Sequence, residues 1–488
     1  MIDPHLVPVQ FRKTPRSHHN VARIVTIVAL AALTGLLIGL VGGPYGLASG
    51  NWLQSSVQIT LPADILYRIS VGLAASGYEL GTSDIFSAHQ LQQTAIALYE
   101  RGALGPQKSA KASYRLGIIY AKSGYRDHAR AMFEQAIQRD GKNTKLYSLL
   151  TRLYADESVE DSSLLKRVDL LDEQERWLAI MTRADLYERV GQRDHAEQLR
   201  AHWRQRQIVF ADIVGILMAF YAVMGLVGVV ALAILVICWL AGRRRSISPW
   251  RKPWNLLDIA EVLVVLLFLL VCASMVTAGL RGVIGPASSS ETTNALLMLV
   301  GYLFSGVCTI ALIAYRIGPR WRVCELLGLK WYRVAACVGR GIVGFGVVVA
   351  LLVITLSVLG QFGIERIVPL APQTPVDVFL GTRSPLTFAV YLLLVGIVAP
   401  VVEETIFRGF VYAGLRRTMT VPAAALASAL VFAAAHVAVP VGGLLAITLI
   451  GVVLAYLYER SGSLIAPMVT HAMYNSFVLL LLAAYALI

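Results

Sequence analysis

Residues 208–241 read IVFADIVGILMAFYAVMGLVGVVALAILVICWLA, an apolar run in which Asp212 is the only charged residue. A helix needs about 20 apolar residues to cross the hydrocarbon core of a bilayer, so this run is long enough to span a membrane. The composition agrees, because 57% of the 488 residues are hydrophobic and 15% are charged, a larger apolar share than a soluble domain has. The sequence therefore predicts an integral membrane protein.

Further apolar runs predict an all-α fold, a polytopic membrane helix bundle of about nine spans. The predicted spans lie at 21–43, 208–241, 256–279, 295–315, 339–360, 385–412, 421–438, 443–458 and 463–486. The run that begins at Pro385 is too long for one straight span, and Pro400 predicts a kink or break within it.

Basic residues predict the orientation, since cytoplasmic loops carry an excess of Lys and Arg. Clusters precede the first predicted span and follow the second and the fourth; they contain Arg12, Lys13, Arg16, Arg23, Arg243, Arg244, Arg245, Arg251, Lys252, Arg316, Arg320, Arg322, Lys330, Arg333 and Arg340. The three clusters fall on one side of the membrane, which predicts a cytoplasmic tail at 1–20. The span at 21–43 is expected to be an uncleaved anchor rather than a cleaved signal peptide, because its apolar stretch exceeds the usual ~7–15 residues.

The formal net charge of +13 raises the question of a nucleic-acid partner. Lipid headgroups and the topology rule explain basic residues in short loops better, so the lipid bilayer is the expected partner and no nucleic acid is. The polar segment 44–207, which the predicted topology places outside the cytoplasm, is joined to a membrane core. This combination favours a bacterial plasma membrane.

The polar segment 44–207 contains an internal repeat, and the predicted topology places it outside the cytoplasm. The string GYRDHA at 124–129 recurs as GQRDHA at 191–196, and tyrosines recur at close to the ~34-residue period of a helix-turn-helix solenoid, namely Tyr120, Tyr154 and Tyr187. The alternation of large and small residues resembles the tetratricopeptide repeat at Tyr114, Leu116, Gly117, Tyr120, Ala129, Phe133 and Ala136. The resemblance implies an inserted tetratricopeptide-like helical solenoid. Its repeated Arg-Asp-His is expected to be a solvated turn, and its concave surface could bind a protein partner or serve packing alone.

Ionisable and amide side chains interrupt the last apolar runs, where they are costly unless they are paired or functional. The segment VVEETIFRG places Glu403 beside Glu404, with Arg408 at the i+4 position where a guanidinium can pair with Glu404. The next runs carry His436, then His471 and Asn475, the last two on one helical face. Each position alone has a plain structural explanation, but together they predict one polar site shared by successive membrane helices.

The pattern Glu403-Glu404-x-x-x-Arg408, Phe432-x-x-x-His436 and His471-x-x-x-Asn475 resembles the signature of the CAAX protease and bacteriocin-processing (Abi) family, which contains the type II CAAX prenyl endopeptidases. The resemblance covers about 385–485 and does not reach the repeat segment. It implies an intramembrane endopeptidase with a site open to the cytoplasm, acting on a protein or peptide substrate. Glu403 and His436 would activate water, His471 and Asn475 would stabilise the oxyanion, and Glu404 with Arg408 would have a supporting role.

The predicted organisation is therefore a tail at 1–20, an anchor at 21–43, the repeat segment at 44–207, membrane helices and loops at 208–384 and a peptidase core at 385–488. A metal is left open: Glu403, His436 and His471 are the ligand types of some catalytic zinc sites, and the family is often labelled as metalloproteases. There is no HExxH motif, so metal-free hydrolysis with glutamate as the base is the preferred mechanism.

Two other classes of function stay in view. A non-catalytic membrane adaptor or immunity-type protein would bind a partner through the repeat segment and use the charged motifs only to hold helices together. A transporter is the second, since buried Glu and His also serve proton relays, but the sequence shows no inverted repeat of broken helices of the kind that transporters use.

Overall fold

The structure is a computed structural model of the full chain. It describes residues 27–28, 30, 57–76, 88–104, 109–155, 162–173, 176–240, 254–284, 290–317, 334–361, 382, 384–436 and 441–487. All regular structure in these residues is helical, which confirms the predicted all-α class.

The α-helices of the described part are, in chain order, α2 (Val57–Ser76), α3 (Ala88–Leu104), α4 (Ala110–Lys122), α5 (Arg126–Arg139), α6 (Thr144–Tyr154), α7 (Arg176–Arg189), α8 (Arg193–Leu240), α9 (Leu256–Ile284), α10 (Glu291–Ile317), α12 (Val334–Gln361), α14 (Pro385–Leu393), α15 (Ala399–Glu404), α16 (Ala413–Leu415), α17 (Val421–Ala434), α18 (Val441–Ser461) and α19 (Ile465–Leu487). Between them lie the 3-10 helices η3 (Gly141–Asn143) and η4 (Ser162–Glu173) and the π-helices η7 (Leu394–Val398) and η8 (Thr405–Tyr412).

Seven helices of the described part are long and apolar enough to cross a membrane. They are α8, α9, α10, α12, the continuous run from Pro385 to Leu415, α18 and α19. Many large apolar side chains on these helices are exposed, as Ile216 is at 69%, which suits a surface that faces lipid tails rather than water. These spans make the chain an integral membrane protein.

The nine predicted spans are confirmed only in part. The predicted span 21–43 lies almost entirely outside the described residues. The predicted span 421–438 is wrong as a full crossing, because its helix α17 ends at Ala434 after 14 residues. At 1.5 Å per residue this helix is about 21 Å long, which is shorter than the ~30 Å hydrocarbon core.

The break expected at Pro400 is not found either. The helix passes through this residue and continues to Leu415, with η7 before α15 and η8 after it. Proline has no N–H and leaves one carbonyl without its usual intrahelical partner, and the wider turn of a π-helix accommodates such a gap without ending the helix. The two glutamates therefore lie on a short α-helical segment between two π-helical segments, a backbone irregularity that is frequent at functional sites.

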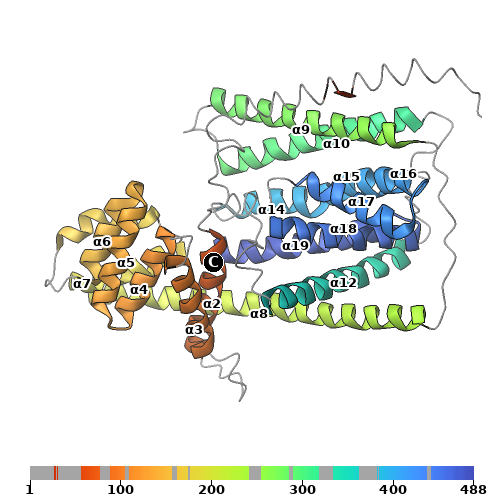
Figure 1. The fold of residues 1–488 in the computed structure, drawn as a ribbon. Coiled ribbons are helices and arrows are strands. Elements are labelled where there is room, and N and C mark those ends of the chain that lie inside the picture. The colour runs from red at the N-terminus through yellow and green to blue at the C-terminus, as the bar shows by residue number, and fades with distance from the viewer. Residues whose placement is uncertain are drawn as a thin grey trace, which may run out of the picture.

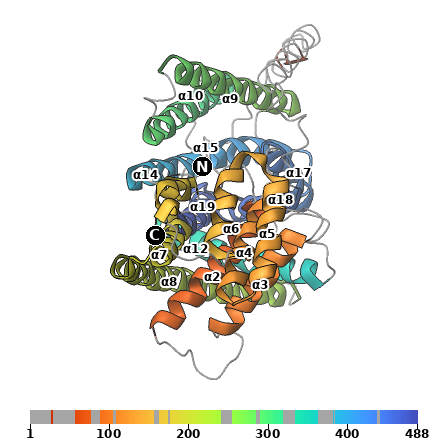
Figure 2. The same cartoon turned by 90° about the vertical axis from the view of Figure 1, so that its left-hand side faces the viewer.

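The membrane helices lie in layers (Figure 1). One layer holds α9 and α10, the next holds α14 to α17, and α18 and α19 follow, with α12 and α8 on the far side. The view along the helices shows the same order, with α2 to α7 at one end of the bundle (Figure 2). The layer with α14 to α17 is thus enclosed between the α9–α10 pair and α18–α19.

Helices α8 and α12 approach each other at two glycines. A Cβ on Gly228 would collide with the backbone of Gly346. Small residues allow membrane helices to pack this closely, because lipid tails are as apolar as leucine and leave van der Waals contact as the main attraction. This contact packs α8 closely against α12 of the bundle.

Helices α2 to α7 and the first turns of α8 form a separate helical domain at one end of the bundle (Figure 1). The two copies of the repeated string have the same local structure. Gly124 and Gly191 have φ of 87° and 81°, a conformation that glycine adopts without strain, and α5 and α8 begin two residues later. His128 and His195 are exposed and pack edge-on against Tyr120 and Tyr187. The solenoid assignment itself stays a prediction.

A buried carboxylate joins the helical domain to the last membrane helix. Asp64 of α2 accepts hydrogen bonds from Tyr99 of α3 (2.5 Å) and Tyr485 of α19 (2.7 Å), and it pairs with Arg115 of α4. Burial and the neighbouring carboxylate raise the pKa of Tyr99 well above its usual range, so its hydroxyl remains a donor. Asp64 therefore connects four helices from both parts of the chain.

Arg68, one turn further along α2, strengthens the same junction. Its Nη1 donates to the carbonyl of Tyr485 at 2.9 Å and its Nε donates to Gln207 of α8 at 2.8 Å. Its guanidinium lies over the ring of Phe210, 3.7 Å from the centroid, a favourable cation–π position. Burial lowers the pKa of Arg68 to about 10, which still leaves the group charged at neutral pH.

Candidate active site

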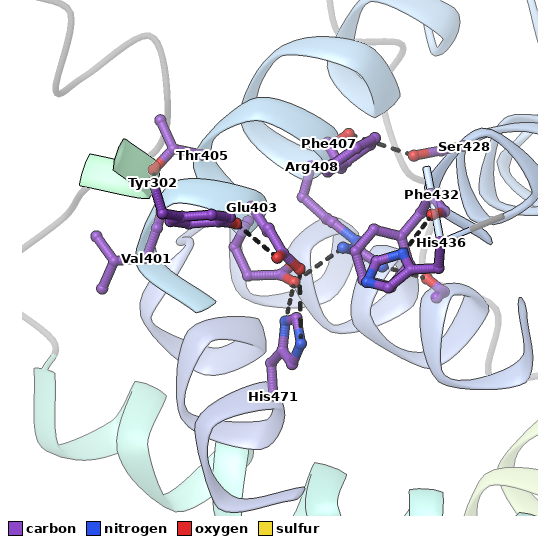
Figure 3. A network of polar contacts seen from close by, with 12 residues as sticks. Tyr302, Val401, Glu403, Thr405, Phe407, Arg408, Ser428, Phe432, His436 and His471 are labelled. Atoms are coloured by element: carbon purple, nitrogen blue, oxygen red, sulfur yellow. Dashed lines mark hydrogen bonds and ion pairs between the residues drawn. The ribbon is translucent and has the colours of Figure 1, made fainter. Parts of the chain in front are cut away.

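The short helix α15 carries two glutamates that point to different surroundings. Glu404 is completely buried, whereas the side chain of Glu403 is 15% exposed. Successive residues of a helix lie about 100° apart around its axis, which explains how neighbours in sequence meet different partners. Figure 3 shows Glu403 above His471.

Glu404 is the centre of a buried ionic cluster. Its Oε1 lies 2.8 Å from Nη1 of Arg408 and 2.8 Å from Nδ1 of His471. The pair with Arg408 confirms the contact predicted from the i, i+4 spacing. Arg408 also donates to the carbonyl of Gly451 at 3.3 Å and is fully buried. Paired and hydrogen-bonded charges of this kind can persist in an apolar interior, whereas an isolated charge cannot.

Two atoms of this cluster have no hydrogen-bond partner among the described residues. They are Oε2 of Glu404 and Nε of Arg408, both buried. An unsatisfied buried polar atom costs about 1–3 kcal/mol and is rare in a structural ion pair. The cluster thus keeps unused hydrogen-bonding capacity.

Glu403 is held from two sides. Tyr302 of α10 donates its hydroxyl to Oε1 at 2.7 Å, and Nε2 of His471 lies 3.8 Å from Oε2. One imidazole therefore lies between the two carboxylates, with Nδ1 toward Glu404 and Nε2 toward Glu403 (Figure 3). The contact with Glu404 therefore orients the imidazole of His471.

His436 lies two residues beyond the end of α17 and is partly buried. Its Nδ1 donates to the carbonyl of Phe432 at 2.9 Å, an arrangement that leaves Nε2 with a lone pair in the neutral ring. The ring of Phe432 packs edge-on against both imidazoles, with its centroid 4.8 Å from that of His436 and 5.7 Å from that of His471. The guanidinium of Arg408 lies over the same ring at 4.4 Å. His436 thus borders the cluster without contacting a carboxylate directly.

Asn475 lies one turn along α19 from His471. Its Nδ2 donates to the carbonyl of Val395 in η7 at 2.8 Å, which satisfies a carbonyl in the widened backbone. This bond ties α19 to the helix that carries the glutamates, and it uses one of the two N–H groups of the amide.

The structure thus brings Glu403, Glu404, Arg408 and His471 into one contact network. It places His436 and Asn475 at the edge of that network. No group of three His, Cys, Asp or Glu side chains in the described part is arranged to hold a metal ion. Glu403, His436 and His471, the ligand set considered from the sequence, therefore do not form such a group among the described residues.

The sequence interpretation missed two contributors, Tyr302 and Phe432. A single tyrosine in an apolar run has the same appearance as a packing residue, and Tyr302 precedes Glu403 by 101 positions. Phe432 was visible only as the residue one turn before His436. Its contacts with Arg408, His436 and His471 depend on the tertiary fold.

One comparison with known proteins covers the part of the chain that contains the site. Residues 385–477, which include all six predicted site residues, match the family model described as Type II CAAX prenyl endopeptidase Rce1-like. No curated protein and no solved structure matches the chain.

The fold and the match together give a coarse description of this part of the chain. Residues 385–477 are similar to the CAAX prenyl endopeptidase family, and they lie among the long apolar helices of an integral membrane protein.

Proposed function

We propose that the chain is an intramembrane endopeptidase that hydrolyses peptide bonds of membrane-associated proteins or peptides. The observation that carries the proposal is the placement of Glu403 within apolar helices, with Tyr302 on one carboxylate oxygen and His471 beside the other. These two contacts orient the carboxylate, and no arginine of the described part pairs with both of its oxygens. One oxygen therefore remains available to a water molecule.

Glu403 and His436 activate the water in this proposal. Glu403 takes a proton from water, the hydroxide attacks the carbonyl carbon, and the proton then goes to the leaving amine as the peptide bond breaks. The lone pair that the neutral ring of His436 keeps on Nε2 suits a second acceptor for that water. The contact of Nδ1 with the carbonyl of Phe432 supports this protonation state.

His471 and Asn475 stabilise the oxyanion of the tetrahedral intermediate. Nε2 of His471, which lies on the side of Glu403, supplies one N–H donor close to the attacked carbonyl when it carries a proton. The second N–H of Asn475 supplies the other. Donors of this kind, fixed before the reaction in a site that excludes water, each lower the barrier by about 2.7–4 kcal/mol.

Glu404 and Arg408 position these groups. The carboxylate of Glu404 orients the ring of His471, and Arg408 holds the carboxylate. This arrangement resembles the role of the acid in a catalytic triad, which fixes an imidazole without exchanging a proton with it. The proposal routes no step through a metal ion.

The topology and the helical domain belong to the same proposal. The Lys and Arg bias favours a helical domain outside the cytoplasm, and the proposal includes a bacterial plasma membrane. The repeated turns at Gly124 and Gly191 support a tetratricopeptide-like solenoid. Such a domain would present peptides or a partner protein to the membrane site.

The test compares the new protein termini in membranes that contain the wild-type chain or the Glu403→Ala variant. We expect a set of peptide ends, rich in membrane-associated sequences, that are present only with the wild-type chain. Identical sets of termini would count against a peptidase. If a Glu403→Gln chain also kept full biological activity, the adaptor function would be favoured.

A further inference from the structure

A cavity lies beside the proposed catalytic carboxylate, on the side of α10 that faces α9. Its volume is about 520 Å³, and its walls come from α9, α10, Tyr391 of α14 and Thr382. Leu270, Ala273 and Thr277 line it from α9, and Asn294 and Met298 line it from α10. This volume is within the range of about 300–1,000 Å³ that is typical of ligand sites.

The cavity reaches the site through Tyr302. This residue lines the cavity and donates its hydroxyl to Oε1 of Glu403 at 2.7 Å. The lining residues of α10 begin at Glu291, eleven residues before Tyr302, which corresponds to about 16 Å along a helix. The cavity therefore follows one face of α10 from its first turn to the hydrogen-bond partner of Glu403.

The space between α10 and α15 closes one turn beyond Tyr302. A Cβ on Gly306 would lie 2.8 Å from the side chain of Val402, so the two helices are in close contact there. In the opposite direction the lining reaches Glu291, in the first turn of α10, and Thr382, three residues before α14. Helix α14 lies at the end of the bundle that carries the helical domain (Figure 1). The cavity thus extends from Tyr302 toward the helical domain.

The lining suits a polypeptide better than a lipid chain. Leu270, Ala273 and Met298 provide apolar contacts, but Oδ1 of Asn294 is buried and has no hydrogen-bond partner among the described residues. An acyl chain has no donor for such an acceptor, whereas every peptide unit other than proline has an N–H.

We propose that this cavity is the substrate channel of the peptidase. A short apolar peptide segment enters from the end of the bundle next to the helical domain, donates a backbone N–H to Asn294 and extends to Tyr302, the hydrogen-bond partner of Glu403. The proposal rests on the proposed function, and it differs from the opening toward the cytoplasm that the family resemblance implies.

The test separates binding from hydrolysis. A diazirine-bearing amino acid replaces Thr277, which lines the cavity, or Val276, which is 61% exposed on the outer side of the same helix. Both chains also carry Glu403→Gln so that bound peptide is not cleaved. The probe is a biotin-labelled peptide of leucine and alanine in phosphatidylcholine vesicles.

We expect peptide adducts from position 277 and few from position 276. Ala273→Trp, which fills the cavity, is expected to lower the adducts from position 277 about tenfold, whereas Val276→Trp on the outer side leaves them unchanged. Adducts with phospholipid alone, or equal peptide adducts from both positions, would overturn the channel. If the adducts form as expected but the wild-type chain cleaves nothing, the channel stands and the proposed function fails.

Discussion

Nδ1 of His471 lies 2.8 Å from Oε1 of Glu404, the same oxygen that binds Arg408. The three side chains come from two helices that are far apart in sequence, and all three are buried. One carboxylate oxygen thus fixes both a guanidinium and an imidazole. The orientation of His471 toward Glu403 depends on this shared contact.

Glu404→Gln should destabilise the protein. Arg408 would remain buried without a charged partner, and the carbonyl of Gly451 would be its remaining original acceptor. The loss of one partner of a buried ion pair costs about 3–5 kcal/mol. The measurement is the free energy of unfolding of the purified chain in detergent. Glu197→Gln is the matched control, because Glu197 is exposed on the helical domain. Equal stability of both variants would show that the buried pair is not ionic.

Tyr302→Phe should lower kcat and leave KM nearly unchanged. The variant keeps the aromatic wall of the cavity but loses the hydrogen bond that holds Oε1 of Glu403, and a displaced base loses about ten- to hundredfold in rate. Steady-state cleavage of a peptide substrate measures both constants. A rise in KM at constant kcat would instead assign Tyr302 to substrate binding alone.

Gly228→Ala should weaken the contact between α8 and α12. The new methyl group would collide with the backbone of Gly346, and overpacking of this kind costs about 1–3 kcal/mol. Gly215→Ala on the same helix is the control, since its Cβ would meet no described atom within 4 Å. Thermal unfolding should therefore separate the two variants, and a similar loss in both would mean that the helices are not in close contact at Gly228.

Tyr485→Phe should loosen the junction between the helical domain and α19. The substitution removes the donor to Oδ2 of Asp64, and a buried carboxylate that loses a hydrogen bond costs about 1–3 kcal/mol. Hydrogen exchange of the amides of α2 and of the last turns of α19 should become faster. Tyr125→Phe, at an exposed position of the helical domain, should leave exchange unchanged. Equal protection in both variants would contradict a structural role for this contact.

The sequence predicted the local contacts well, because helix periodicity alone sets them. The pair of Glu404 with Arg408 follows from a spacing of four residues, and the long spans follow from apolar length. The length of α17 could not be predicted in this way. Apolar residues continue past Ala434, but the helix ends there, since hydropathy reports which residues tolerate lipid and not where a helix ends.

The sequence pattern could not predict the contacts between helices. His471 was expected beside the other site residues, but its bond to Glu404 requires the packing of α19 against α15. His436 was expected to share a water with Glu403, and the structure packs the ring of Phe432 against both His436 and His471. The cavity that ends at Tyr302 depends on α9 and α10, which lie outside the segment that carries the motifs.

The most direct test of the account uses water labelled with ¹⁸O. Purified chain in lipid bilayers is incubated with membrane proteins in labelled water, and the new carboxyl termini are analysed by mass spectrometry. The account predicts ¹⁸O in these termini with the wild-type chain and none above background with Glu403→Gln. Equal labelling with both chains would contradict the central claim that Glu403 activates the water that cleaves the peptide bond.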